Sequence, residues 1–175
     1  MEEQIMNMPA VALRGLTILP GMIAHFDISR ERSLRAVEEA MEQDQKIYLV
    51  TQRNVDSEDP TQEDLYQMGI VADIKQVVRL QNDVVRILVD GISRAALLGF
   101  TGNEKYLEAE ICYCDSNADS LPEDLREAML LGVREAFHRY AAVVGKISKE
   151  LIRQIDQYED LEKLIDYVQQ SAGVI

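Results

Sequence analysis

The stretch GIVADIKQVVRLQNDVVRILVD, residues 69–90, decides the fold class. Apolar and charged side chains alternate along both of its halves, which is the pattern of a strand with one buried face. Between the halves, Gln81-Asn82-Asp83 suits a tight turn because Asn and Asp tolerate positive φ. We therefore predict a β-hairpin whose buried face carries Ile70, Ala72, Ile74, Val78 and Leu80, then Val85, Ile87 and Val89 on the return strand.

Shorter runs of the same kind lie on both sides of this hairpin. Residues 8–14, 22–28, 46–52, 92–101 and 106–114 are predicted strands. Residues 31–44 are a predicted helix, with Leu34, Val37 and Met41 on its buried stripe and Ser29 as its N-cap. The polar residues 53–64 are a predicted surface loop. Six or seven short strands with one inserted helix predict a small barrel that is closed or nearly closed.

The pattern becomes helical near residue 116. The polar residues 116–120 are a predicted linker, and Ser120 followed by Glu123 resembles a capping box. Gly145 is expected to end the first helix and Ser148 to cap the second. The expected buried stripes are Leu125, Met129, Val133, Phe137 and Tyr140, then Leu151, Ile152 and Ile155, then Leu161, Leu164, Ile165 and Val168. The chain is thus predicted to be α+β, with a β lobe over residues 1–115 and a lobe of about three helices over 120–175.

Composition excludes several classes of function. The formal charge of −13 opposes binding to nucleic acid or to an anionic membrane, since both favour a basic surface. No run approaches the roughly 18 apolar residues of a membrane span. The first residues, MEEQ, are acidic where a secretory signal needs positive charge. Two cysteines are too few for a disulfide framework, so we expect a cytoplasmic protein.

Several phrases of the β half, taken in order, carry a family resemblance. They are PAVALR (9–14), ILPGM (18–22), RERS (30–33), IYLVTQ (47–52), DLYQMGIVA (64–72) and VDGISR (89–94). With this order and spacing, residues 8–113 resemble the N-terminal, substrate-binding domain of bacterial Lon ATP-dependent proteases. The segment DLEKLID (160–166) is similar to the helical second lobe of that family, though it is less diagnostic. Ala12 and Gly21 depart from the usual family pattern without threatening the fold.

The resemblance implies a PUA-like β pseudo-barrel with one inserted helix, followed by a helical lobe. It also implies a homohexameric parent that degrades misfolded and regulatory proteins with ATP and Mg and a Ser–Lys dyad. We expect the present chain to be the first part of such a protease, with no cofactor of its own. Its expected partners are unfolded or damaged polypeptides and sister subunits.

The residues themselves offer little chemistry. Gly145-Lys146 is the only Gly-Lys pair, and Tyr140 and Ile147 stand where a phosphate-binding loop needs glycine and a hydroxyl residue. Ser148-Lys149 is an unsuitable dyad because neighbours on a helix face different ways. Cys112, Cys114, His25 and His138 lack the spacing of zinc ligands, and we expect the two thiols to be partly exposed on the outside of the barrel.

The candidate binding residues are apolar side chains in a connection between strands. Residues 16–23, LTILPGMI, are apolar on both parities, so some of them should protrude. A polypeptide or subunit contact is therefore predicted for Leu16, Ile18, Leu19, Met22 and Ile23. Two alternatives stay open: the same residues pack under the helix at 31–44, or they pair domains within an assembly. A nucleic-acid-binding role rests on fold analogy alone, and the negative charge opposes it.

Overall fold

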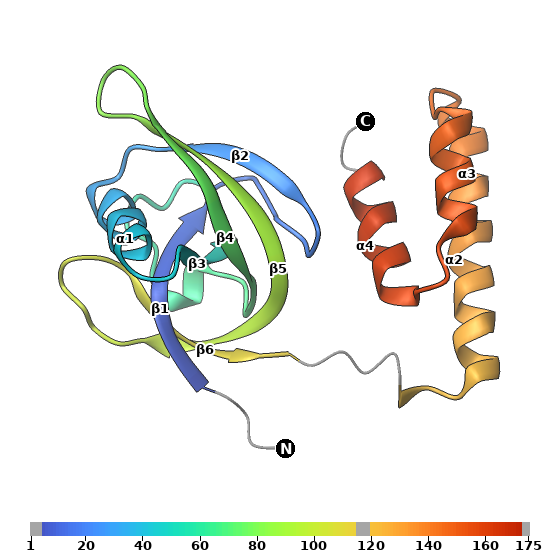
Figure 1. The fold of residues 1–175 in the computed structure, drawn as a ribbon, viewed down its shortest axis with the longest axis horizontal. Coiled ribbons are helices and arrows are strands. Elements are labelled where there is room, and N and C mark those ends of the chain that lie inside the picture. The colour runs from blue at the N-terminus through green and yellow to red at the C-terminus, as the bar shows by residue number, and fades with distance from the viewer. Residues whose placement is uncertain (1–4, 115–119, 173–175) are drawn as a thin grey trace. The chain divides into compact units, whose positions relative to one another are not determined.

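The computed structural model describes residues 5–114 and 120–172. The chain divides into two compact units, Met1–Cys114 and Asp115–Ile175, and we describe each by itself. The first holds all the described strands and the second is helical (Figure 1). This arrangement confirms the predicted α+β class. No described helix is long and apolar enough to cross a lipid bilayer.

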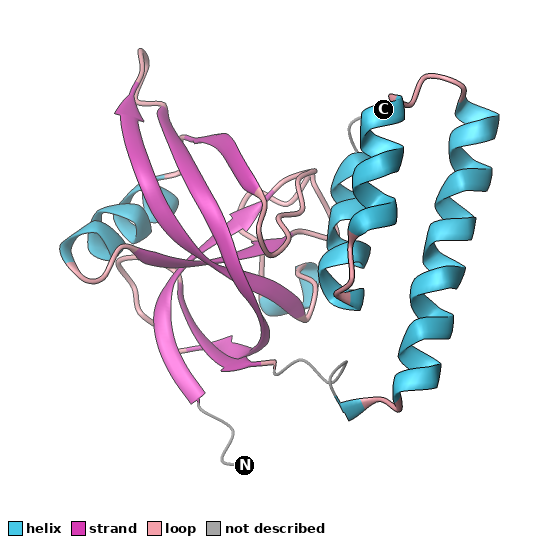
Figure 2. Cartoon of the chain, turned by 45° about the vertical axis from the view of Figure 1, so that its right-hand side comes forward, coloured by secondary structure: helices cyan, strands magenta, loops and turns pink. Residues whose placement is uncertain are grey.

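The first unit is a six-stranded sheet that closes on itself. Its strands lie in the order β2-β5-β4-β3-β1-β6, and a further pairing of β5 with β6 completes a barrel. Only β1 and β3 run parallel among the described pairs. Figure 2 shows how the strands curve to close the barrel. The strand bounds are β1 Ile5–Leu13, β2 Ile23–Ile28, β3 Lys46–Thr51, β4 Met68–Arg79, β5 Val85–Phe100 and β6 Glu108–Tyr113.

The hairpin predicted over residues 69–90 is formed by β4 and the first half of β5. Asn82 and Asp83 take φ values of 60° and 57° in its turn, which confirms the expected positive φ. Ile70, Ala72 and Ile74 are buried as predicted, whereas Val78 and Leu80 are exposed. The register shifts between Ile74 and Gln76, and the end of the hairpin extends beyond the core (Figure 1). The alternation of apolar and polar residues along β4 therefore continues beyond the part of the strand that contacts the core.

Residues 92–101, predicted as a separate strand, belong to the single 16-residue β5. The strand passes through Gly91 because a bulge is present there, with a register shift against Val71 and Ala72. A Cβ on Gly91 would lie 2.3 Å from the Leu19 carbonyl oxygen. The glycine is thus required by the close approach of the β1–β2 connection and does not end the strand.

Both faces of the sheet are buried over much of the barrel. Along β1, Met8, Ala10 and Ala12 belong to one apolar cluster, while Val11 and Leu13 belong to another. The first cluster draws on β1, β3, β4, β5 and β6, and the second includes helix α1, Glu31–Glu42. This double burial explains why β1 and β3 read as continuous apolar runs.

Helix α1 packs on β1 and β3 through small residues. Its buried residues are Ser33, Ala36, Val37 and Ala40. The predicted place of Met41 in the core is wrong, because this side chain is 38% exposed. Ser29 is not the N-cap either; the cap position is Arg30, and no side chain caps the helix. Alanines let the helix approach the sheet closely, which turns the larger side chains toward the edge of the contact.

The second unit contains the three predicted helices, α2 Glu123–Val144, α3 Lys149–Gln157 and α4 Leu161–Ala172. Phe137, Ile155 and Leu164 lie at the centre of its core. Gly145 ends α2 in the left-handed conformation with φ 67°, and Ser148 Oγ accepts a hydrogen bond from Leu151 N at 3.1 Å, so both predicted caps are confirmed.

The predicted start of α2 is wrong, and of its predicted buried stripe only Phe137 is fully buried and Val133 partly buried. Pro122 occupies the N-cap position without a side-chain hydrogen bond, so Ser120 is not the N-cap of this helix. The buried residues of α2 are Leu130, Phe137 and Ala141, whereas Leu125, Met129 and Tyr140 are exposed. At 100° per residue, the buried stripe is rotated by about 80° from the prediction. Apolar residues surround much of this helix, so periodicity alone did not select the correct face.

Candidate polypeptide-binding surface

Four of the predicted contact residues, Leu16, Ile18, Leu19 and Met22, lie in the connection between β1 and β2, and Ile23 is the first residue of β2. The chain turns at Gly15 and Gly21, with φ values of 65° and 71°. Gly21 N donates to the Gly91 carbonyl oxygen at 2.7 Å, and Gly91 N donates to the Met22 carbonyl oxygen at 2.9 Å. Thr51 Oγ1 donates to the Leu16 carbonyl oxygen at 2.9 Å. These bonds fix the connection to β5 and β3 as part of the rigid barrel.

The five candidate side chains differ widely in exposure. Ile18 is only 5% exposed and belongs to the core, whereas Ile23 is 67% exposed. Leu16 and Met22 are half-buried against the core cluster that includes α1, and Leu19 is also half-buried. Among the five candidates, the most exposed side chain is therefore Ile23, the first residue of β2, and Leu16, Leu19 and Met22 of the connection are partly exposed. Whether these residues contact a polypeptide stays a prediction.

A residue that sequence reasoning missed lies beside Ile23. In the β2–β5 register, Ile23 is opposite Asp90, and Ile92 follows Asp90 by two residues, at the bulge of β5. Ile92 is 45% exposed. Alternation along the strand gave no signal for it, because the register of β5 shifts between Gly91 and Ser93. Ile23 and Ile92 form what we call the isoleucine pair.

A second exposed apolar row crosses the other end of the barrel and was also missed. Met68 is opposite Ala96, Ala96 is opposite Cys112, and Cys112 is opposite Ile5. Met68 and Ile5 are about half exposed. Only the strand register brings these residues together, so their sequence spacing gave no signal. Leu98, 44% exposed, lies two residues from Ala96 on the same strand.

A cavity of about 530 Å³ opens next to the β1–β2 connection. Val11, Leu13, Leu16 and Phe26 provide apolar wall, and Leu16 thus belongs both to the connection and to the cavity. Arg14, at the end of β1, and Arg30, at the start of α1, provide positive charge. The remaining lining residues are Ala12, Asp27, Ile28, Ser29, Ser33 and Glu58.

The two arginines meet at one main-chain oxygen. Arg14 Nη2 donates to the Ser57 carbonyl oxygen at 3.0 Å, and Arg30 Nη2 donates to the same oxygen at 3.1 Å. Arg30 Nη2 also donates to Gln52 Oε1 at 2.9 Å, while Gln52 Nε2 donates to the Ser57 oxygen at 3.0 Å. Burial, and after it the positive charge of Arg14, lower the pKa of the Arg30 guanidinium.

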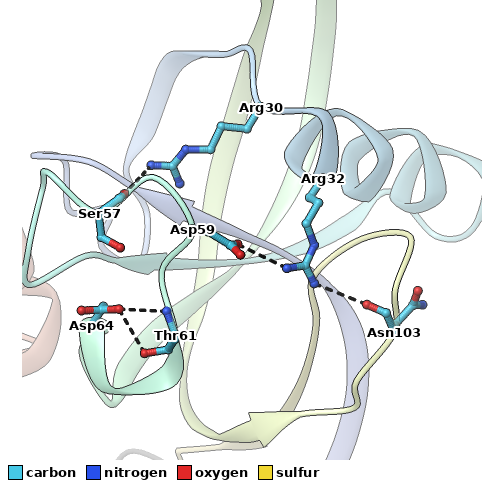
Figure 3. Close-up of polar contacts among 7 residues, drawn as sticks. All are labelled: Arg30, Arg32, Ser57, Asp59, Thr61, Asp64 and Asn103. Atoms are coloured by element: carbon cyan, nitrogen blue, oxygen red, sulfur yellow. Dashed lines mark hydrogen bonds and ion pairs between the residues drawn. The ribbon is translucent and has the colours of Figure 1, made fainter.

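The same bonds order the loop at residues 53–64. Arg30 and Arg32 extend from the first turn of α1 toward this loop, where Arg32 forms an ion pair with Asp59 at 3.4 Å (Figure 3). The loop ends in a short 3-10 helix, Gln62–Asp64, which Thr61 and Asp64 cap reciprocally. The predicted surface loop is thus confirmed as exposed, with a short helical turn that the sequence reading did not include.

The cysteines and His138, considered above as zinc ligands, belong to different units of the chain. Cys114 carries an exposed thiol and Cys112 a half-buried one, as predicted, and Cys114 Sγ lies 3.7 Å from Met68 Sδ. His138 Nε2 lies 2.8 Å from Asp156 Oδ1 on the helical unit. Residues 5–114 and 120–172 contain no cluster of three or more His, Cys, Asp or Glu side chains placed to hold a metal ion.

Comparison with known proteins places this geometry in a family. Residues 7–172 match the model of the ATP-dependent protease La (LON) substrate-binding domain. The chain is 37% identical over 166 residues to a Lon protease of Lachnoclostridium phytofermentans, covering 95% of the chain and 20% of that protein. It is 30% identical over 167 residues to Lon protease 1 of Bacillus subtilis, covering 95% of the chain and 21% of that protein.

Two solved structures share the fold at low sequence identity. The N-terminal domain of Mycobacterium avium complex Lon protease superposes with a TM-score of 0.60 at 16% identity, covering 94% of this chain and 98% of that chain. A Lon N-terminal domain protein from Xanthomonas campestris gives a TM-score of 0.54 at 14% identity with the same coverage. The chain spans about a fifth of the length of the curated relatives that it matches. By its sequence and its fold, the chain belongs to the family of Lon substrate-binding domains.

Proposed function

We propose that this chain binds exposed apolar segments of unfolded polypeptides for an ATP-dependent Lon protease, and that it makes or breaks no covalent bond itself. ATP, Mg and the peptidase residues act in other domains of that protease. The observation that carries this proposal is the isoleucine pair, which exposes large aliphatic side chains on a hydrogen-bonded barrel face. A rigid surface of this kind loses little conformational entropy on binding.

The expected affinity is low. Full burial of an isoleucine side chain stabilises by about 1.5–3 kcal/mol, so two partly exposed ones contribute about 2–4 kcal/mol before the costs of association. Such a contact discriminates weakly between sequences, which suits recognition of many unfolded proteins. Several copies in one assembly would raise the effective affinity through multivalency.

Titration of unfolded casein into the chain tests the proposal. We expect Ile23→Asp combined with Ile92→Asp to weaken binding at least tenfold, because charge replaces the apolar contact area. Leu98→Asp is a matched control, since Leu98 lies on the same strand and is as exposed as Ile92. If the unmodified chain fails to bind casein at millimolar concentration, the proposed function is wrong. If only Leu98→Asp weakens binding, the polypeptide binds the second apolar row instead.

A second candidate function, assembly of sister subunits, is favoured by the exposed side of α2. Leu125, Met129, Tyr140 and Val143 lie within an arc of about 60° on this helix and are all exposed. Between them, a Cβ on Gly132 would meet no atom within 4 Å. Light scattering over a range of concentrations separates the two functions, because assembly requires self-association that Val143→Asp weakens. Self-association lost instead through Ile23→Asp would place the contact at the β1–β2 connection.

A further inference from the structure

Arg14 and Arg30 hold unusual positions in an acidic protein. The chain has 31 acidic and 18 basic residues, yet neither guanidinium forms an ion pair with any carboxylate among the residues that the structure describes. Other arginines of the barrel unit do form such pairs: Arg32, Arg35, Arg79 and Arg86. Two neighbouring cations that form no ion pair repel each other, so an anion placed between them would be stabilised.

Both arginines keep hydrogen-bond donors free for such an anion. Their bonds to Ser57 and Gln52 use only the Nη2 group of each guanidinium. Nε and Nη1 of each side chain therefore have no partner within the described part of the protein. An arginine offers its donors in a planar fork that matches the two oxygens of a carboxylate.

The other charges around the cavity leave its positive character in place. Asp27 is held by Arg86 through two hydrogen bonds of 2.7 and 2.8 Å. Asp59 and Glu58 are exposed and lie within Coulombic range of Arg30, but neither forms an ion pair with it, and Asp59 pairs with Arg32 instead. The first turn of α1 has no side-chain cap, so its N–H groups add partial positive charge beside Arg30.

The wall next to these cations is apolar. Leu16 and Phe26 are half-buried and line the cavity together with the buried Val11 and Leu13. The volume of about 530 Å³ lies within the range of small-ligand sites. A ligand that contacts both the cationic wall and the apolar wall of the cavity must carry an anionic group and an apolar group close together.

We propose that this cavity binds the C-terminal residue of an unfolded polypeptide, with its α-carboxylate between Arg14 and Arg30 and an apolar side chain against Leu16 and Phe26. In a C-terminal residue both groups are attached to one Cα, which matches the adjacent cationic and apolar walls. An internal Asp or Glu would bring two uncompensated peptide groups into the apolar part. Inorganic phosphate would leave that part unfilled. The inference rests on the proposed polypeptide-binding function and specifies a second place where a client is held.

The test compares two forms of one peptide on the unmodified 175-residue chain. An N-acetylated, fluorescently labelled peptide ending in Gly-Ala-Phe is titrated with a free C-terminal carboxylate and with a C-terminal amide. We expect the amide to bind about tenfold more weakly, because it loses the charge-assisted hydrogen bonds. The difference should shrink as salt rises, since the charges lie near the surface. Competition by N-acetylphenylalanine, but not by millimolar orthophosphate, should displace the carboxylate peptide.

Variants then assign the preference to the arginines. Arg14→Gln and Arg30→Gln should each make the acid and the amide bind equally, whereas Arg35→Gln should keep the preference. Arg35 is a matched control because it lies on α1 and pairs with Glu31 away from the cavity. Thermal unfolding shows whether each variant is folded, and the acid–amide comparison on the unmodified chain needs no variant at all.

Each outcome separates this inference from the proposed function. Equal affinity of acid and amide, or displacement by orthophosphate as effective as by N-acetylphenylalanine, overturns the carboxylate site. If casein still binds through the isoleucine pair, the proposed function survives that result. If neither peptide binds while casein does, the inference is likewise wrong. If neither peptide nor casein binds, the carboxylate site and the proposed polypeptide-binding function are both wrong.

Discussion

Replacing Gly91 by alanine should loosen the β1–β2 connection from the barrel. The added Cβ would lie 2.3 Å from the Leu19 carbonyl oxygen and 3.1 Å from its carbonyl carbon. Main-chain atoms cannot rotate aside as a flexible side chain does, so the connection must move. Its movement would break the 2.7 and 2.9 Å bonds that join Gly91 to Gly21 and Met22.

The size of the effect follows from these contacts. Two main-chain hydrogen bonds contribute about 1 kcal/mol each, and displacement of the buried Ile18 from the core adds about 1–2 kcal/mol. We therefore expect Gly91→Ala to lower the free energy of unfolding of the barrel unit by about 3–4 kcal/mol. Gly132→Ala is the matched control, because Gly132 lies mid-helix on α2 with open space around it. There we expect stabilisation by about 0.5–1 kcal/mol from helix propensity.

Native-state hydrogen exchange, read by mass spectrometry on peptic fragments, measures the barrel and the helical unit separately. Gly91→Ala should lower protection in the barrel peptides and leave the peptides of α2 unchanged. The reverse should hold for Gly132→Ala, with increased protection in α2 alone. Unchanged protection around β5 in Gly91→Ala would refute the claim that the close approach of Leu19 requires a glycine.

Two further predictions concern the helical unit and an ion pair on the barrel. Phe137→Ala should destabilise the helical unit by about 3–5 kcal/mol because the ring lies in its core. Val143→Ala should change stability by less than about 0.5 kcal/mol because this side chain is 87% exposed. Urea unfolding followed by circular dichroism checks both variants, and equal effects would contradict the assigned face of α2. The hydrogen bonds from Arg86 lower the pKa of Asp27 below its ordinary value of about 3.9. The Asp27 carboxylate therefore contributes stability above about pH 4, and this stability is lost as the pH falls through the lower folded-state pKa. The unmodified chain should be more stable than Asp27→Asn at pH 7 and should lose that advantage in acid. A difference in urea midpoint that does not change with pH would count against this pairing.

Local patterns in the sequence were sufficient where one interaction determines the conformation. The turn at Asn82 and Asp83, the left-handed Gly145 and the Ser148 cap each depend on residues within a few positions, and all three were predictable. The ordered family phrases identified the barrel and the helical lobe together. These features need no knowledge of distant contacts.

The buried faces of α1 and α2 were not predictable in the same way. In both helices the large apolar residues were expected inside, yet Met41 and Met129 are exposed while Ala40 and Ala141 are buried. Close packing between elements favours small residues at the point of nearest approach. The neighbouring element determines which small residues lie at this point. The sequence of the helix alone does not indicate them.

The candidate binding features were predictable only in part, for a related reason. Ile23 belongs to an apolar run that was recognisable in the sequence, but Ile92 comes near it only because Ile23 pairs with Asp90 in the β2–β5 register. The cavity brings together Arg14, just after β1, and Arg30, just before α1, which are separated by 16 positions and by all of β2. Such a site follows from the closure of the barrel, so no spacing along the chain indicates it.

Leu16 connects the two proposed contacts physically. It lies in the connection that leads into β2 at Ile23, and its side chain also lines the cavity beside Arg14. A polypeptide whose C-terminal residue fills the cavity would therefore continue past an apolar connection, and two weak contacts on one client would reinforce each other through effective concentration. Gly91→Ala, which shifts this connection, should then weaken both casein binding and the carboxylate preference, whereas Ile23→Asp should weaken the first alone. A shift of the connection that leaves the carboxylate preference unchanged would show that the two contacts are independent.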